Sequence, residues 1–236
     1  MASEPQERTQ FDSMEPWLAS FANLDKPRTI TSSLREVPKF SINLEANKGS
    51  TEEKRMRAAI VAEAQKKWPG MDVAAAIREG RLNVPLSDGD KLADKAAQKS
   101  ADSGKSRLRE WSRGKVVLIA RSKDEYPPAV TIRENGQTIE LESLDAVSRA
   151  KVKFLYTGVQ VLFGVRLNAY DAVGADGKPG VNAYLEAVES LGTGEKLIAA
   201  KDRTERFRGY IGLEKNEDPT GAAAGSGAAA GSGGDW

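Results

Sequence analysis

Hydrophobic residues in the second half of the chain alternate with polar ones, in short runs divided by turn-forming residues. Such alternation is typical of strands that bury one face. The dipeptide Asn135-Gly136 lies between two of the runs and suits the positive φ angles of a tight hairpin. The chain is therefore constrained to a fold dominated by antiparallel strands. The runs are KVVLIARS (115–122), PAVTI (128–132), TIEL (138–141), RAKVKFLYTGVQVLFGVRLNAYD (149–171) and VNAYLEAVESL (181–191).

An earlier stretch changes from the period of a strand to that of a helix. PKFSINLEA (38–46) alternates as a half-buried strand does. An S-x-x-E capping box then precedes hydrophobic residues that recur at four-residue steps from Met56 until Pro69. Two shorter helices are predicted over residues 71–80 and 91–101.

These patterns together predict a mainly β fold with a helical insertion (α+β). We expect an OB-like, five-stranded antiparallel barrel over residues 28–213, with helices inserted after the first strand at about 50–110. Residues 1–27 mix Pro, Ser and charge with isolated aromatics, which predicts an arm lying on the domain outside its core. Residues 214–236 contain a long Gly/Ala/Ser tract that cannot bury apolar surface, so a flexible, disordered tail is expected.

The composition excludes most familiar catalytic sites. Cysteine and histidine are absent, which removes disulfides, thiolate nucleophiles, imidazole bases and the usual zinc ligands. A metal-dependent nucleic-acid enzyme using Asp88 and Asp90 remains an alternative, although two carboxylates in SDGD are more typical of a turn before a helix. We expect no enzyme and no cofactor. The chain has neither a secretory signal nor an apolar run of about 18 residues, so a cytoplasmic protein without membrane contact is expected.

Positive charge is concentrated in two windows although the net charge is only +1. Residues 91–123 carry ten basic against three acidic side chains, and residues 149–166 carry four basic and no acidic ones. Such concentration favours an anionic polymer as partner. A solvated basic helix face remains the alternative for the part of the first window over 91–109.

The candidate binding residues combine cations with aromatic rings at strand spacing. Proteins that bind a single strand without sequence preference use cations along the backbone and exposed rings on which bases stack. Lys151 and Lys153 are expected on one face of a strand, and Arg166 and Tyr170 on one face further along. Phe40, Phe154 and Phe163 are assigned to the core. The predicted nucleic-acid-binding residues are Lys115, Arg121, Lys123, Tyr126, Lys151, Lys153, Tyr156, Arg166 and Tyr170.

The stretches ARSKDEYPPAVTIRENGQ and YTGVQVLFGVRLNAYDAVGADGKPGVNAYLEAVESLGTGEKL resemble phage-encoded single-stranded DNA-binding proteins with an OB fold, similar to the replication binding proteins of short-tailed lytic phages. The likeness covers roughly residues 38–200. It implies a non-catalytic protein that coats and protects single-stranded DNA during replication or recombination. It also implies a C-terminal tail that contacts replication proteins.

The end of the chain departs from that family's pattern. Such proteins end in a dense acidic run closed by an aromatic residue, whereas here few acids surround a neutral spacer before Asp235 and Trp236. We expect these two residues to bind a partner, with a frayed terminus or an artificial linker as the alternative. RNA binding or a structural phage role, and a homodimer, also remain open.

Overall fold

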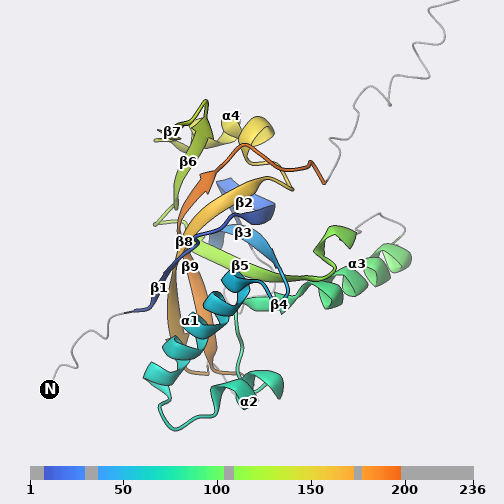
Figure 1. Cartoon of the computed structure of the whole chain (residues 1–236), viewed down its shortest axis with the longest axis vertical. Coiled ribbons are helices and arrows are strands. Elements are labelled where there is room, and N and C mark those ends of the chain that lie inside the picture. The colour runs from blue at the N-terminus through green and yellow to red at the C-terminus, as the bar shows by residue number, and fades with distance from the viewer. Residues whose placement is uncertain (1–7, 30–36, 104–108, 173–176, 198–236) are drawn as a thin grey trace, which may run out of the picture. The chain divides into compact units, whose positions relative to one another are not determined.

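The computed structural model describes residues 8–29, 37–103, 109–172 and 177–197, within one compact unit that spans Met1–Ile198. Its centre is a strongly curved sheet with helices attached at its ends (Figure 1). The described residues form nine strands in this sheet. The strands are β1 (Gln10–Asp12), β2 (Trp17–Thr29), β3 (Pro38–Asn47), β4 (Leu86–Asp88), β5 (Lys115–Lys123), β6 (Ala129–Glu134), β7 (Gln137–Glu140), β8 (Gln160–Tyr170) and β9 (Gly180–Ser190).

Five of these strands pair in a closed circuit. β8 pairs with β2, β2 with β3, β3 with β5, β5 with β9, and β9 pairs again with β8. β1 adds to β8, β4 to β5, and the hairpin β6–β7 to β9. The curvature gives the sheet an inner face, which carries the core, and an outer face.

The sheet differs from the predicted five antiparallel strands in number and direction. It contains nine strands, and β9 runs parallel to both β5 and β6. Parallel neighbours need a long connection, and here the connection between β5 and β9 contains the β6–β7 hairpin, a helix and β8. The predicted hairpin itself is confirmed, with φ angles of 51° at Asn135 and 77° at Gly136.

The helical insertion lies between β3 and β5. It consists of α1 (Thr51–Lys67), α2 (Val73–Arg78), α3 (Gly89–Ser103) and the 3-10 turn η1 (Glu110–Ser112), with β4 between α2 and α3. The Ser50 side chain accepts a hydrogen bond from the Glu53 amide, as the predicted capping box requires. Asp72 caps α2 in the same way through the Ala75 amide. No described helix is long and apolar enough to cross a membrane.

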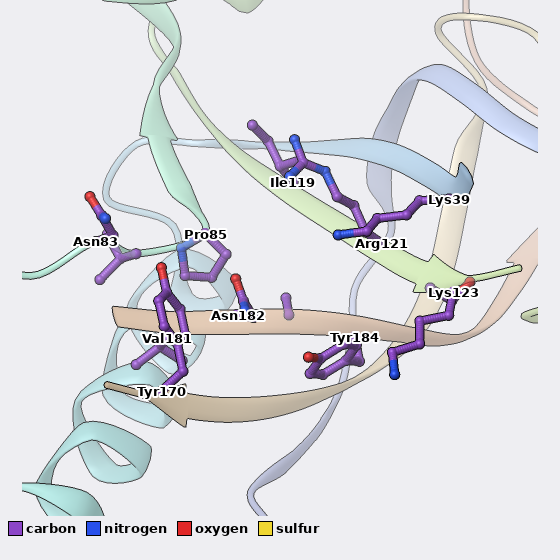
Figure 2. Close-up of a pocket in the computed structure, with 13 residues that line it drawn as sticks. Lys39, Asn83, Pro85, Ile119, Arg121, Lys123, Tyr170, Val181, Asn182 and Tyr184 are labelled. Atoms are coloured by element: carbon purple, nitrogen blue, oxygen red, sulfur yellow. The ribbon is translucent and has the colours of Figure 1, made fainter. Parts of the chain in front are cut away.

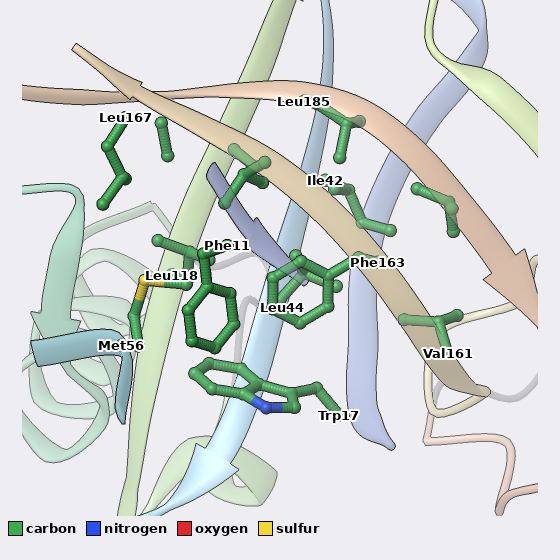
Figure 3. Close-up of a cluster of buried hydrophobic side chains, with 14 of the residues drawn as sticks. Phe11, Trp17, Ile42, Leu44, Met56, Leu118, Val161, Phe163, Leu167 and Leu185 are labelled. Carbon is green, nitrogen blue, oxygen red and sulfur yellow. The ribbon is translucent and has the colours of Figure 1, made fainter. Parts of the chain in front are cut away.

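The core fills the inside of the curved sheet (Figure 3). Trp17 from β2 meets Phe163 from β8 edge to face, with ring centroids 5.3 Å apart. Phe11 from β1 lies 6.0 Å from the same Phe163 ring. Phe40 and Phe154 are also buried, as predicted.

The prediction of a peripheral arm over residues 1–27 is wrong for its described part. β1 and β2 are integral strands, and Phe11 and Trp17 are 5% and 1% exposed. Isolated aromatics in a polar segment suggest surface contacts, but pairing with β8 and β3 turns these residues inward. The predicted boundary at 213 and the tail over 214–236, with Asp235 and Trp236, lie outside the described residues.

The prediction of a strand from residue 149 is also wrong, because Leu144–Phe154 form a helix, α4. Ser143 caps it by accepting from the Ala146 amide at 3.2 Å. Val147 and Phe154 are buried at a spacing of seven residues, two helical turns. The capped start and this period outweigh the short alternation of Lys and apolar residues near the helix end.

Candidate nucleic-acid interface

The outer face of the sheet carries a row of three cations from three neighbouring strands. Arg28 on β2 lies directly across from Lys39 on β3, and Lys39 lies directly across from Lys123 on β5. Like charges at opposed positions repel and destabilise a sheet. Among the described residues none of the three forms an ion pair with a carboxylate. These three residues, Arg28–Lys39–Lys123, form a concentration of positive charge that we call the cation row.

A second row runs beside it and places a tyrosine between two arginines. Arg121 on β5 pairs in register with Tyr184 on β9, and Tyr184 pairs with Arg166 on β8. Residues directly opposite in neighbouring strands share a face of the sheet. The arginine–tyrosine row, Arg121–Tyr184–Arg166, thus presents an aromatic ring with a guanidinium on each side.

Two adjoining hollows follow these rows, and we call them together the groove. The first holds about 210 Å³ and lies between Lys39, Arg121 and Tyr170, as Figure 2 shows. The second holds about 590 Å³ and is lined by Tyr126, Arg166 and Asn168, among others. Both include Ser122, Lys123 and Tyr184, so the groove is continuous along the outer face.

The positive charge of Arg121 is the one in the groove that its surroundings stabilise least. Its Nε atom is buried and has no hydrogen-bond partner among the described residues. Burial lowers the pKa of its guanidinium, because removal from water disfavours the charged form. A guanidinium held in this state gains from any anion that replaces the lost water, and phosphate matches its planar donors.

Arg166 is partly compensated. Its Nε atom lies 3.2 Å from a carboxylate oxygen of Glu186, and both side chains remain partly exposed. An exposed ion pair of this kind is weak, so a phosphate can compete for the arginine. Glu186 is the one carboxylate among the described residues that line the groove.

Three tyrosines border the groove at different depths. Tyr126 follows the end of β5 and is 68% exposed. Tyr184 is half-buried within its row. Tyr170 lies over Gly180, where an added Cβ would come within 2.6 Å of the tyrosine oxygen and of the Asn83 carbonyl. The glycine therefore leaves the space in which the Tyr170 side chain lies.

The structure brings five of the nine predicted residues together in the groove. These are Arg121, Lys123, Tyr126, Arg166 and Tyr170. Lys115 lies at the other end of β5, where its Nζ donates to the Trp111 carbonyl at 2.6 Å.

The remaining three predicted residues belong to α4 and the segment after it. Lys151 pairs with Asp25 at 2.7 Å, and Lys153 pairs with Glu134. Tyr156 packs against the core, and its hydroxyl donates to the Gly194 carbonyl at 2.9 Å. None of the three lines the groove.

Lys39 and Tyr184 line the groove but were missed by the sequence analysis. The signal was present, because each lies on the polar side of an alternating run. Lys39 alternates with Phe40 and Ile42, and Tyr184 with Ala183 and Leu185. What the sequence lacked was the strand order that places both next to Arg121.

Asp88 and Asp90, the acids of the enzyme alternative, have a different partner. The Lys48 ammonium lies 2.9 Å from Asp88 and 2.5 Å from Asp90. This hydrogen bonding holds the pKa of both carboxyls below the usual range and raises that of Lys48. Among the described residues no group of three potential metal ligands is found. Asp88 accepts hydrogen bonds from the Asp90 and Lys91 amides at the start of α3, and both acids pair with Lys48.

Comparison with solved structures shows the same fold in a single-stranded DNA-binding protein of a bacteriophage. The single-stranded DNA-binding protein of bacteriophage Enc34 in complex with ssDNA matches with a TM-score of 0.55 at 20% identity, over 80% of this chain and 90% of that one. A second structure of the Enc34 protein matches with a TM-score of 0.52 at 21% identity, over 86% of this chain and 90% of that one. A looser similarity is to gp2.5, a single-stranded DNA-binding protein of bacteriophage T7, with a TM-score of 0.48 at 14% identity over 93% and 100%.

Comparison with protein families gives a match over most of the chain. A search among curated proteins found no match. The family model described as the ssDNA-binding protein of Enterobacter phage Enc34 matches residues 17–219, which include every strand of the closed circuit. The chain therefore belongs to the phage single-stranded DNA-binding protein family represented by that of Enterobacter phage Enc34.

Proposed function

We propose that this protein binds single-stranded DNA along the groove, without sequence preference and without catalytic turnover. The observation that carries the proposal is the cation row of three opposed positive side chains next to the arginine–tyrosine row. Such an arrangement costs stability in the free protein and is relieved by a polyanion. Tyr126, Tyr170 and Tyr184 offer rings for stacking beside these charges.

The closed circuit of five strands supports an OB-like barrel as the core of the binding domain. We propose that this domain consists of residues 28–213 together with β1 and β2. In this proposal the protein coats and protects single-stranded DNA during phage replication or recombination, in the cytoplasm of the host cell. Asp235 and Trp236 would bind replication proteins, and a homodimer remains part of the proposal to be measured by sedimentation.

A titration of labelled oligo-dT against the protein, compared with duplex DNA of the same length, tests the proposal. The single strand should bind more tightly, and the logarithm of its affinity should fall linearly with that of the salt concentration. Arg121→Gln should reduce the slope by about 0.7, the counterion release of one phosphate contact on a single strand. The matched control is Arg133→Gln, because Arg133 is exposed and pairs with Glu189 outside the groove.

Equal affinity for duplex and single strand, or the same salt slope for Arg121→Gln and wild type, would contradict the proposal. Loss of arginine charge should not unfold the protein, since burial already disfavours that charge. Competition with oligo-U separates DNA binding from the RNA-binding alternative, which predicts that oligo-U displaces oligo-dT.

A further inference from the structure

Phe21 is an exposed aromatic residue in an unusual backbone conformation. It lies in β2 where the register with β3 shifts between Ser20 and Asn23, as in a β-bulge. Its φ angle is 51°, and 41% of the residue is exposed. A bulky side chain at positive φ is strained, and an exposed ring gains little from burial to offset this. Bulges of this kind change the direction in which a side chain points, and they are frequent next to functional sites.

Two neighbours hold the Phe21 ring. The guanidinium carbon of Arg109 lies 4.9 Å from its centroid, and the Trp111 ring lies 6.1 Å away at an angle of 39°. Arg109 is itself fixed by Glu45, with 3.1 Å between nitrogen and oxygen. Glu45 is buried and also accepts hydrogen bonds from Ser20 and Ser112, so this charge is fully satisfied. We call Phe21, Arg109 and Trp111 the Phe21 platform.

Two in-register pairs connect the segment beside the platform with the groove. Asn23, next to the bulge, pairs in register with Ser41 on β3, and Ser41 pairs with Arg121 on β5. Two strand spacings are about 10 Å, the length of about three stacked nucleotides at about 3.4 Å each. The β3 residues on this face, Ser41 and Asn43, are half-buried, uncharged and polar.

The charge along this route suits the same ligand as the groove. The carboxylate of Glu45 on β3 is buried and paired with Arg109, so it presents no exposed negative charge. The Trp111 Nε1 atom is buried and has no hydrogen-bond partner in the part of the chain that the structure describes. An aromatic ring fixed by a cation and reached across a neutral polar surface fits a nucleobase whose backbone lies in the groove.

We propose that the Phe21 platform is a second base-stacking site, which extends the single-stranded DNA path from the groove across β3 to β2. This rests on the proposed function, because the groove supplies the phosphate contacts. A short oligonucleotide can bind within the groove alone, whereas a longer one also covers the platform. The platform therefore sets how affinity increases with oligonucleotide length.

The experiment measures the affinity of wild type and Phe21→Asn for oligo-dT of about five and about fifteen nucleotides, lengths within the range occupied per OB fold. Asparagine removes the ring but tolerates positive φ, so the bulge is kept. Phe21→Asn should bind the longer oligonucleotide at least about fivefold more weakly, the lower bound for the loss of one stacked base. Binding of the shorter one should be weakened less, and Phe21→Trp should retain wild-type affinity for the longer one.

Two controls separate failure of this inference from failure of the proposed function. Val152→Ala removes another exposed apolar side chain, 77% exposed on α4, and should leave both affinities unchanged. Arg121→Gln should weaken both lengths. If Arg121→Gln weakens binding but Phe21→Asn does not affect the longer oligonucleotide, the platform is not a stacking site. If neither variant changes binding, the groove proposal fails as well.

Trp111 gives a second measurement on the intact protein. Its ring is half-buried next to Phe21, so a base stacked on the platform should quench its fluorescence. Trp111→Phe isolates that share of the signal. The quenching assigned to Trp111 should occur with the longer oligonucleotide and be absent in Phe21→Asn. Quenching that persists undiminished in Phe21→Asn would overturn the inference.

Discussion

Replacement of Lys39 by glutamine should make the protein more stable and its DNA binding weaker. Lys39 is the middle of the cation row, directly opposite Arg28 on one side and Lys123 on the other. Each like-charged cross-strand pair costs about 0.2–1 kcal/mol, so removing the shared charge should relieve about 0.4–2 kcal/mol. For a domain of this size that is a rise of very roughly 1–8 °C in Tm, since 1 kcal/mol corresponds to about 2–4 °C.

The same substitution should remove one phosphate contact. The slope of log affinity against log salt should fall in magnitude by about 0.7, and the loss of affinity should shrink as salt increases. The stability gain should shrink as well, because the Debye length shortens from about 10 Å at 0.1 M to about 3 Å at 1 M salt.

The assay combines thermal unfolding with oligo-dT titration, both at several salt concentrations. Lys153→Gln is the matched control, because Lys153 is paired with Glu134 and lies outside the groove. It should lower stability slightly, or not at all, and leave the salt slope unchanged. If Lys39→Gln lowers the Tm at low salt, or leaves the salt slope at its wild-type value, the cation row is not a destabilising phosphate site and the reasoning is refuted.

Three further outcomes are expected. Tyr184→Ala should weaken oligo-dT binding by about 1–3 kcal/mol without changing the salt slope, and a change in slope alone would contradict a stacking role. Gly180→Ala should lower the free energy of unfolding by about 1–3 kcal/mol and weaken DNA binding, because the new methyl group comes within 2.6 Å of the Tyr170 oxygen; wild-type melting would be inconsistent with this close approach. Lys151→Met should destabilise the protein above about pH 5 but not below the folded-state pKa of Asp25, and it should not change DNA binding. Burial alone would raise the pKa of Asp25, but the Lys151 ammonium lowers it. The stabilisation from this ion pair is therefore lost as the pH falls through the folded-state pKa of Asp25. A stability difference that persists at low pH would count against this ion pair.

The local elements were predictable where one short signal decides the structure. The caps at Ser50 and Asp72, and the hairpin at Asn135-Gly136, depend on residues only a few positions apart. β2 was not predicted, because its pattern is interrupted by the bulge at Phe21 and it gains its structure from pairing with β3 and β8.

The sequence predicts which strand faces carry the binding residues, but it does not predict which of these residues lie next to one another. Alternation placed Arg121 and Arg166 on polar faces, and the structure confirms that both face the groove. Their shared neighbour Tyr184 depends on the parallel pairing of β5 with β9, which no local pattern encodes. Lys151 was placed wrongly because it lies on the helix α4 and not on a strand, and its partner Asp25 is distant in the sequence.

The short strand β1 has a consequence for how the protein can be handled. It covers β8 from Gly164 to Arg166, and backbone hydrogen bonds from Ser13 to Phe163 and from Leu167 to Thr9 extend that cover. An uncovered edge strand is a template for pairing with another chain. Trimming the chain to begin at Trp17 would expose this edge beside the groove, so we expect such a truncated protein to exchange strands or aggregate during purification. A version that retains the chain from Thr9 onward, with any affinity tag placed before that residue on a spacer, should not exchange strands or aggregate.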